Sequence, residues 1–251
     1  MTRIGVQAAD GRARLTLTQG PISPRVLRVA ENGARIGLVA TQALLLGGDH
    51  VHLDIEVGPG AWLELVETAG TVAYDADGAG SSWTVSILVA GGGVLIWAGE
   101  PFVVARGANV ARSTTIELGA GAVACIRETL VLGRSAEIGG AIRSTMMVRH
   151  APPVGGPPTD LLCEDLDLTD IRTRGLPGLL GDTRIIDTVS LLGMRAPTEP
   201  AVRTGQRFDL AGPGTLARSL TTTFAASGLP TVMDGWSDEA RGTLVSAATT
   251  S

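Results

Sequence analysis

Between Arg14 and Arg149 the hydrophobic residues recur with a period of two, and glycine-rich turns separate the alternating segments. This period is typical of β-strands that bury one face, and no stretch in this half of the chain shows a convincing helical period. The segments that alternate or are rich in β-branched residues are 14–18, 52–57, 84–89, 113–118 and 141–148. The chain is therefore predicted to be mostly β.

A weak internal repeat runs through the same region. Residues 54–65, 85–97 and 115–125 each contain a strand, a turn centred on glycine and a second strand, and 208–217 resembles a fourth copy. The turn glycines Gly60, Gly93 and Gly121 recur about every 30 residues. Such a period predicts an elongated β-helix or solenoid-like stack of many strands. The alternative is a run of ordinary β-hairpins, which also place glycine in their turns.

The C-terminal half contains the clearest break in the pattern and the few helix candidates. Residues 151–158 are rich in proline and glycine and are predicted to form a surface loop. Residues 216–226 are one helix candidate, and Ser237 to Arg241 resembles a short capped helix. We therefore expect one or two short helices near the C-terminus and treat residues 1–251 as a single domain.

Composition excludes several classes of protein. A net charge of −5 and a pI of about 5.2 argue against nucleic acid as a partner. All 20 basic side chains are arginine, and the lack of lysine excludes a Walker A phosphate loop and a Schiff-base mechanism. The first residues lack the apolar run of a signal peptide, and the longest apolar stretch, residues 36–46, is too short to cross a bilayer. We expect a cytoplasmic protein with no membrane partner.

Three acidic residues fall in the phase of the core residues on separate predicted strands. Asp49 shares the phase of Val51 and Leu53, while Glu128 and Glu164 each share the phase of neighbouring leucines. A carboxylate on a buried face requires a partner or a wet cavity, so the three acids could together line an internal polar passage. Alternatively, β-bulges shift the phase, and each acid faces water or pairs with Arg127, Arg134 or Arg143.

Two histidines offer a second candidate metal site. His50 and His52 lie two residues apart, so on a strand they project from the same face, together with Asp54 and Glu56. Imidazole and carboxylate groups suit a divalent metal such as nickel or zinc. The same alternation also fits the solvated outer face of an edge strand, and we favour that interpretation. His50 and His52 are therefore expected to make transient metal contacts only, with no permanently bound cofactor.

Several motifs follow the order and spacing of one protein family. Residues 46–61 contain Leu-Gly-Gly-Asp-His, an alternating strand and Gly-Pro-Gly-Ala, and residues 71–75 are Thr-Val-Ala-Tyr-Asp. Trp97-Ala-Gly-Glu-Pro-Phe follows, and Leu-Gly-Arg (132–134) and Leu-Cys-Glu (162–164) complete the series. Over residues 30–170 the chain resembles the urease accessory protein family UreD, also called UreH. Val72 and Asp75 stand where this family usually carries Lys and Arg.

The resemblance implies a non-enzymatic chaperone of urease maturation with a β-helix-like fold. Members of this family bind the urease apoprotein and bridge it to UreF, which in turn recruits the GTPase UreG. They are associated with the passage of nickel through an internal channel into the urease active site. At matching positions, the resemblance places Asp49, Thr71, Glu128 and Glu164 on that nickel path.

Two other functions are compatible with the residues themselves. A β-solenoid carbohydrate-active enzyme would use two of the inward acids as paired carboxylates. The aromatic content of 3% counts against this enzyme, because sugar-binding grooves stack aromatic rings on their ligands. A plain protein-interaction module would bind partners and have no metal role.

Overall fold

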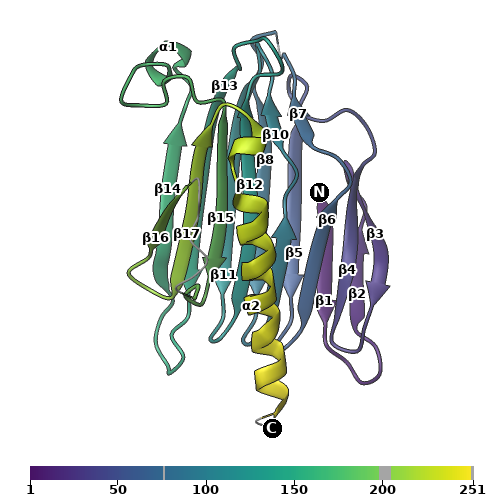
Figure 1. Ribbon diagram of the computed structural model, residues 1–251. Coiled ribbons are helices and arrows are strands. Elements are labelled where there is room, and N and C mark those ends of the chain that lie inside the picture. Colours follow the sequence, from purple (N-terminus) through teal and green to yellow (C-terminus); the bar gives the residue numbers. More distant parts are fainter. Residues whose placement is uncertain (76, 198–204, 250–251) are drawn as a thin grey trace.

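The computed structural model describes residues 1–75, 77–197 and 205–249. Two long β-sheets lie face to face, and helix α2 (Leu229–Thr249) lies along the outer face of one of them (Figure 1). The chain passes repeatedly from one sheet to the other and forms a β-solenoid of about four turns. This architecture confirms the mostly β, solenoid-like prediction.

Sheet A contains seven strands of the described chain, and its five central strands run parallel. Its two edge strands, β14 and β2, pair antiparallel with their neighbours. In spatial order the strands are β14 (Thr159–Asp167), β13 (Ala141–His150), β11 (Asn109–Leu118), β8 (Ser81–Val89), β5 (His50–Val57), β1 (Thr2–Gln7) and β2 (Arg14–Thr18).

Sheet B has a parallel centre and antiparallel strands at both sides. Its main path is β16 (Gln206–Asp209), β17 (Gly214–Thr221), β15 (Ile185–Leu192), β12 (Val123–Leu132), β9 (Val94–Ala98), β6 (Trp62–Glu67), β4 (Gly33–Ala40) and β3 (Ile22–Val29). Two short strands, β7 (Thr71–Ala73) and β10 (Phe102–Val104), pair with each other, and β10 also pairs with the second half of β12.

The predicted repeat corresponds to successive turns of the solenoid. Gly60, Gly92 and Gly121 occupy equivalent turns between the sheets, and each has a positive φ of 61 to 68°. The turns stack through backbone hydrogen bonds: the Gly60 amide donates to Gly91 at 3.1 Å and the Gly92 amide donates to Ala120 at 3.0 Å. The prediction placed the middle position at Gly93, one residue too late. The hairpin alternative is wrong for these turns, because the strands that they join belong to different sheets.

The proposed fourth copy at 208–217 is wrong. These residues include the end of β16 and the start of β17, which pair directly as an antiparallel hairpin at the edge of sheet B. Residues 151–158 connect β13 to β14, two adjacent strands of sheet A, and most of them are exposed.

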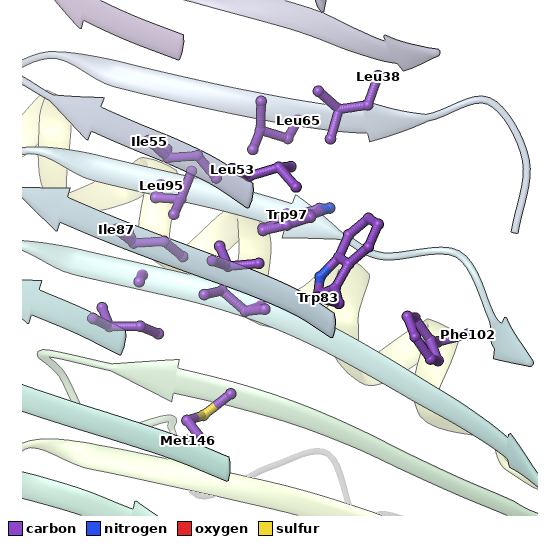
Figure 2. Close-up of a cluster of buried hydrophobic side chains, with 14 of the residues drawn as sticks. Leu38, Leu53, Ile55, Leu65, Trp83, Ile87, Leu95, Trp97, Phe102 and Met146 are labelled. Atoms are coloured by element: carbon purple, nitrogen blue, oxygen red, sulfur yellow. The ribbon is translucent and has the colours of Figure 1, made fainter. Parts of the chain in front are cut away.

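The main hydrophobic core fills the space between the two sheets. It is built from the inward positions of almost every strand, as the period of two requires. Figure 2 shows part of this core, in which Leu53, Ile55 and Leu65 lie among the side chains of neighbouring strands and Trp83 lies between Trp97 and Phe102. Trp83 and Phe102 make an edge-to-face contact with their ring centroids 5.8 Å apart.

A second core lies between the outer face of sheet B and α2. The helix contributes residues spaced three or four apart, which pack on Val94, Val123 and Cys125. These helix residues are Leu229, Val232, Met233, Trp236 and Ala240. Helix α2 is therefore far longer than the short helix expected around Ser237 to Arg241.

The other helix candidate is also corrected. Residues 216–226 contain most of β17 and a 3₁₀ turn (Phe224–Ala226), whereas the additional short helix is α1 (Ile171–Arg174). No helix in the described part of the chain is long and apolar enough to cross a membrane.

A polar network fixes the start of α2 to sheet B. The fully buried Asp187 accepts hydrogen bonds from Arg127 Nε at 3.0 Å and Nη2 at 2.9 Å, and from Thr129 Oγ1 at 2.9 Å. Ser227, two residues before the helix, donates to the same carboxylate.

Candidate functional site

In sheet B, two neighbouring solenoid turns each have a break in their strand at a level where strand β12 of the adjacent turn is continuous. Cavities lie beside these breaks. Residues 68–70 separate β6 from β7, and 99–101 separate β9 from β10, whereas β12 continues across the same level. A cavity of about 140 Å³ lies between residues 40–44 and 67–74 and is called the loop cavity here. A smaller one of about 30 Å³, the core cavity, lies between the sheets. Glu67, Thr71 and Trp83 line both.

Glu67 stands between the two cavities. It ends β6 on the same face as the buried Leu63 and Leu65, so the alternation of the strand carries its carboxylate inward. Trp97 Nε1 donates a hydrogen bond to Oε1 at 2.8 Å, and the Glu100 amide donates to Oε2 at 3.2 Å. Burial raises the pKa of the Glu67 carboxyl to about 7, although these two bonds and the nearby Arg112 oppose the rise.

Arg112 and Glu128 both line the core cavity and are in direct contact with each other. Arg112 comes from β11 of sheet A and Glu128 from β12 of sheet B, and their side chains form an ion pair. The exposed fractions of the two side chains are 11% and 18%. The Arg112 guanidinium also lies 5.7 Å from the centre of the Phe102 ring.

The polar residues continue from the core cavity toward the C-terminal end of the solenoid. In sheet B, Glu128 lies opposite Thr188, which in turn lies opposite Arg218. Arg218 donates to Thr188 Oγ1 at 3.0 Å and makes two hydrogen bonds of 2.6 and 2.8 Å to Glu164 of sheet A. We call the whole set the internal polar band: Glu67, Arg112, Thr114, Glu128, Ser144, Glu164, Thr188 and Arg218.

Each sheet contributes four residues to this band. In sheet A, Arg112 lies opposite Ser144 of β13 and donates to its Oγ at 3.4 Å. Thr114, one inward position further along β11, is buried and also lines the core cavity. The band therefore crosses the solenoid roughly perpendicular to the strands.

The structure brings three of the sequence-predicted path residues to this region. Thr71 lines both cavities, Glu128 lies in the core cavity, and Glu164 ends the band beside Arg218. Asp49 lies elsewhere, in the turn before β5, where its carboxylate accepts a hydrogen bond from the Leu46 amide at 3.0 Å. That turn adjoins the loop cavity, because the Leu45 carbonyl accepts from the amide of Tyr74, one of the cavity residues.

The two histidines lie on the outer face of sheet A. His50 is exposed, with Nδ1 2.8 Å from Ser82 Oγ, and His52 is half-buried on the same face. The outward orientation agrees with the interpretation that we favoured, but β5 is a central strand and not an edge strand. No group of three or more His, Cys, Asp or Glu side chains in the described residues could hold a metal ion.

Comparison with known proteins identifies the family. The sequence model of the family described as UreD urease accessory protein matches residues 2–237. The chain belongs to the UreD family. Urease accessory protein UreD 1 of Streptomyces griseus subsp. griseus is 47% identical over 201 residues, which make up 80% of this chain and 75% of that protein.

Two further UreD proteins show the same relationship. UreD of Frankia casuarinae is 39% identical over 204 residues, which cover 78% of this chain and 62% of that protein. UreD 1 of Saccharopolyspora erythraea is 37% identical over 224 residues, or 85% of this chain and 84% of that protein.

Sequence reasoning missed three charged members of the band in this UreD-family chain: Glu67, Arg112 and Arg218. Each lies in the phase of buried neighbours on its own strand, which is the signal that singled out Glu128. The arginines named from the sequence as possible partners of the acids are wrong, because Arg127, Arg134 and Arg143 pair with Asp187, Glu137 and Asp165. Glu128 pairs with Arg112 and Glu164 with Arg218, so both acids are inward-facing and paired at once.

Proposed function

We infer that this chain is a non-enzymatic maturation chaperone of urease. In this role it binds the urease apoprotein, bridges it to UreF and through UreF to UreG, and acts in the cytoplasm as one functional unit. Nickel is its cargo and passes through the interior without a permanent site. Membership of the UreD family supports the role in urease maturation.

The observation that carries the nickel part of the proposal is the internal polar band. A solenoid interior built by alternation is apolar, and burying carboxylates there is costly unless they have partners or a function. Here oxygen groups from both sheets continue from the loop cavity to the far end of the sandwich. Separate oxygen ligands can relay a hard or borderline cation that a closed cage would retain.

We assign the path to Asp49, Thr71, Glu128 and Glu164. Asp49 would act at the turn beside the loop cavity, Thr71 between the two cavities, and Glu128 and Glu164 along the band. His50 and His52 would make transient nickel contacts on the outer face of sheet A, apart from this path.

The test replaces the native gene in cells that express the urease operon and measures both urease activity and urease nickel content. Glu128→Gln and Thr71→Val should lower both values while the chain still co-purifies with its UreF-like partner. Glu117→Gln is the matched control, because Glu117 is exposed on the outer face of sheet A and has no place in the proposed path, so both values should stay unchanged. Normal activation by Glu128→Gln would exclude the nickel path, and normal activation without the chain would exclude the chaperone role altogether.

Loss of activation together with loss of partner binding has a different meaning. It would favour a plain interaction module, in which the chain assembles the complex but carries no nickel. Pull-down of a UreF homologue by each variant separates these two results.

A further inference from the structure

The core cavity already contains a positive charge at the position where a passing cation would need a ligand. The Arg112 guanidinium pairs with Glu128, and Glu67 lines the same small cavity. Arg112 also interacts electrostatically with Glu67. A divalent cation that approached Glu128 in this arrangement would meet a fixed charge of its own sign at contact distance, where the interior screens repulsion poorly.

Arg112 is held less completely than a purely structural buried arginine. Its Nε and the nearby Thr114 Oγ1 are buried and have no hydrogen-bond partner among the described residues. Its bond to Ser144 is long, at 3.4 Å, and its other neighbour is the face of the Phe102 ring. Buried polar atoms are nearly always paired, so an unpaired guanidinium N–H and a neighbouring unpaired hydroxyl show that Arg112 is not fully anchored in its position.

Arg174 gives an internal comparison. It is also buried, but its two terminal nitrogens donate to the Gly140 and Gly139 carbonyls at 2.8 and 2.7 Å. Those bonds fasten a loop, and neither acceptor is a carboxylate. Arg112, by contrast, forms its ion pair with the carboxylate of Glu128, which is a proposed path residue.

We propose that Arg112 is the gate of the internal passage: its guanidinium closes the path by occupying Glu128, and a divalent cation reaches that carboxylate only when Arg112 turns away. This inference rests on the proposed function and adds a regulatory residue to it. The gate keeps the passage closed to cations in the resting chain. It also explains how an acid can lie in the passage without forming a permanent metal site.

The experiment measures binding of Ni²⁺ alone to the full-length chain by equilibrium dialysis and calorimetry. Arg112→Gln removes the positive charge but leaves Glu128 and Glu67 in place, so it should bind one additional Ni²⁺ per chain. Because one positive charge beside Glu128 is removed, the dissociation constant for Ni²⁺ at Glu128 should be lower than in the native chain by a factor on the order of ten or more. Arg112→Gln combined with Glu128→Gln should lose the added site.

Two further variants keep the result interpretable. Arg143→Gln removes an exposed arginine from the outer face of the same sheet and should bind nickel as the native chain does. Arg112→Met preserves the aliphatic stem beside Phe102 and repeats the test if Arg112→Gln does not fold. A folded Arg112 variant, shown by cooperative unfolding, that binds nickel no better than the native chain would overturn the gate.

The gate and the proposed function can fail separately. If Glu128→Gln lowers urease activation but neither Arg112 variant gains nickel, the path stands and the gate is wrong. If the Arg112 variants gain a Glu128-dependent site while Glu128→Gln activates urease normally, Arg112 does guard a cation site but the path to urease is wrong.

Discussion

Arg218 of β17 and Glu164 of β14 connect the two sheets at the C-terminal end of the solenoid through two hydrogen bonds of 2.6 and 2.8 Å. The two strands lie at or near the edges of different sheets, and no backbone ladder joins them. The pair is half-buried, with side-chain exposures of 26% and 33%. It therefore contributes to closing the end of the sandwich, whatever else Glu164 does.

The first prediction concerns this pair. Glu164→Gln should lower the free energy of unfolding by about 1 kcal/mol, because Arg218 keeps a hydrogen-bond acceptor but loses a charged partner. A double-mutant cycle with Arg218→Met, measured by urea denaturation, should give a coupling energy of about 1 kcal/mol or more. The exposed pair Arg143–Asp165 is the control and should couple more weakly. Equal coupling for both pairs would show that Glu164 does not close the sandwich.

The second prediction concerns Glu67. Its folded pKa of about 7 lies above the ordinary value of 4.5, so between these pH values the folded chain holds a proton that the unfolded chain has released. Stability should therefore fall as the pH rises through this window, by about 3 kcal/mol at most.

Urea denaturation at pH 5 and pH 8 measures that decrease. Glu67→Gln has no group that titrates there, so most of the decrease should disappear. Glu64→Gln is the matched control, because Glu64 lies on the opposite face of the same strand and pairs with Arg35. A decrease that persists in Glu67→Gln would assign it to another group.

The third prediction concerns the attachment of α2. Asp187→Ala should cost about 3 kcal/mol or more, because it leaves Arg127 without its charge partner and two hydroxyl groups without their acceptor. Hydrogen exchange should then increase first at the start of α2, next to Ser227. Asp165→Ala removes an exposed acid and should have a much smaller effect on both measurements. Unchanged exchange in α2 would show that the hydrophobic contacts alone hold the helix.

The fourth prediction tests the stacking of the glycine turns. A Cβ at Gly119 would lie 2.6 Å from the Gly91 amide nitrogen of the next turn, so Gly119→Ala must push two turns apart. A Cβ at Gly60 meets no atom within 4 Å, and Gly60→Ala bears only the cost of its positive φ, about 1 kcal/mol. Thermal unfolding should show Gly119→Ala as clearly the less stable variant. The reverse order would mean that the turns are not packed as closely as described.

The two helix predictions show that local sequence signals alone do not determine where the helices of this chain begin and end. Leu229, Val232, Met233, Trp236 and Ala240 have helical spacing that can be found in the sequence. The helix was nevertheless predicted too short, because glycine and threonine lower the local helix propensity of this segment. Packing on the outer face of sheet B supplies the stabilisation that propensity does not. Residues 216–226 were misassigned for a related reason, since their strand depends on pairing with β15.

The period of two and the turn glycines can be recognised in the amino-acid sequence, and they predict which side of each strand faces the interior. Those signals are local: they favour a solenoid without excluding hairpins, and they place Glu128 in the phase of the core residues without showing that it faces inward. Which inward residues meet is a property of the folded chain alone. Strands far apart in the chain are aligned by their lateral register, which places Arg112 against Glu128 and Arg218 against Glu164. That register depends on how all the turns stack together, and no single strand encodes it.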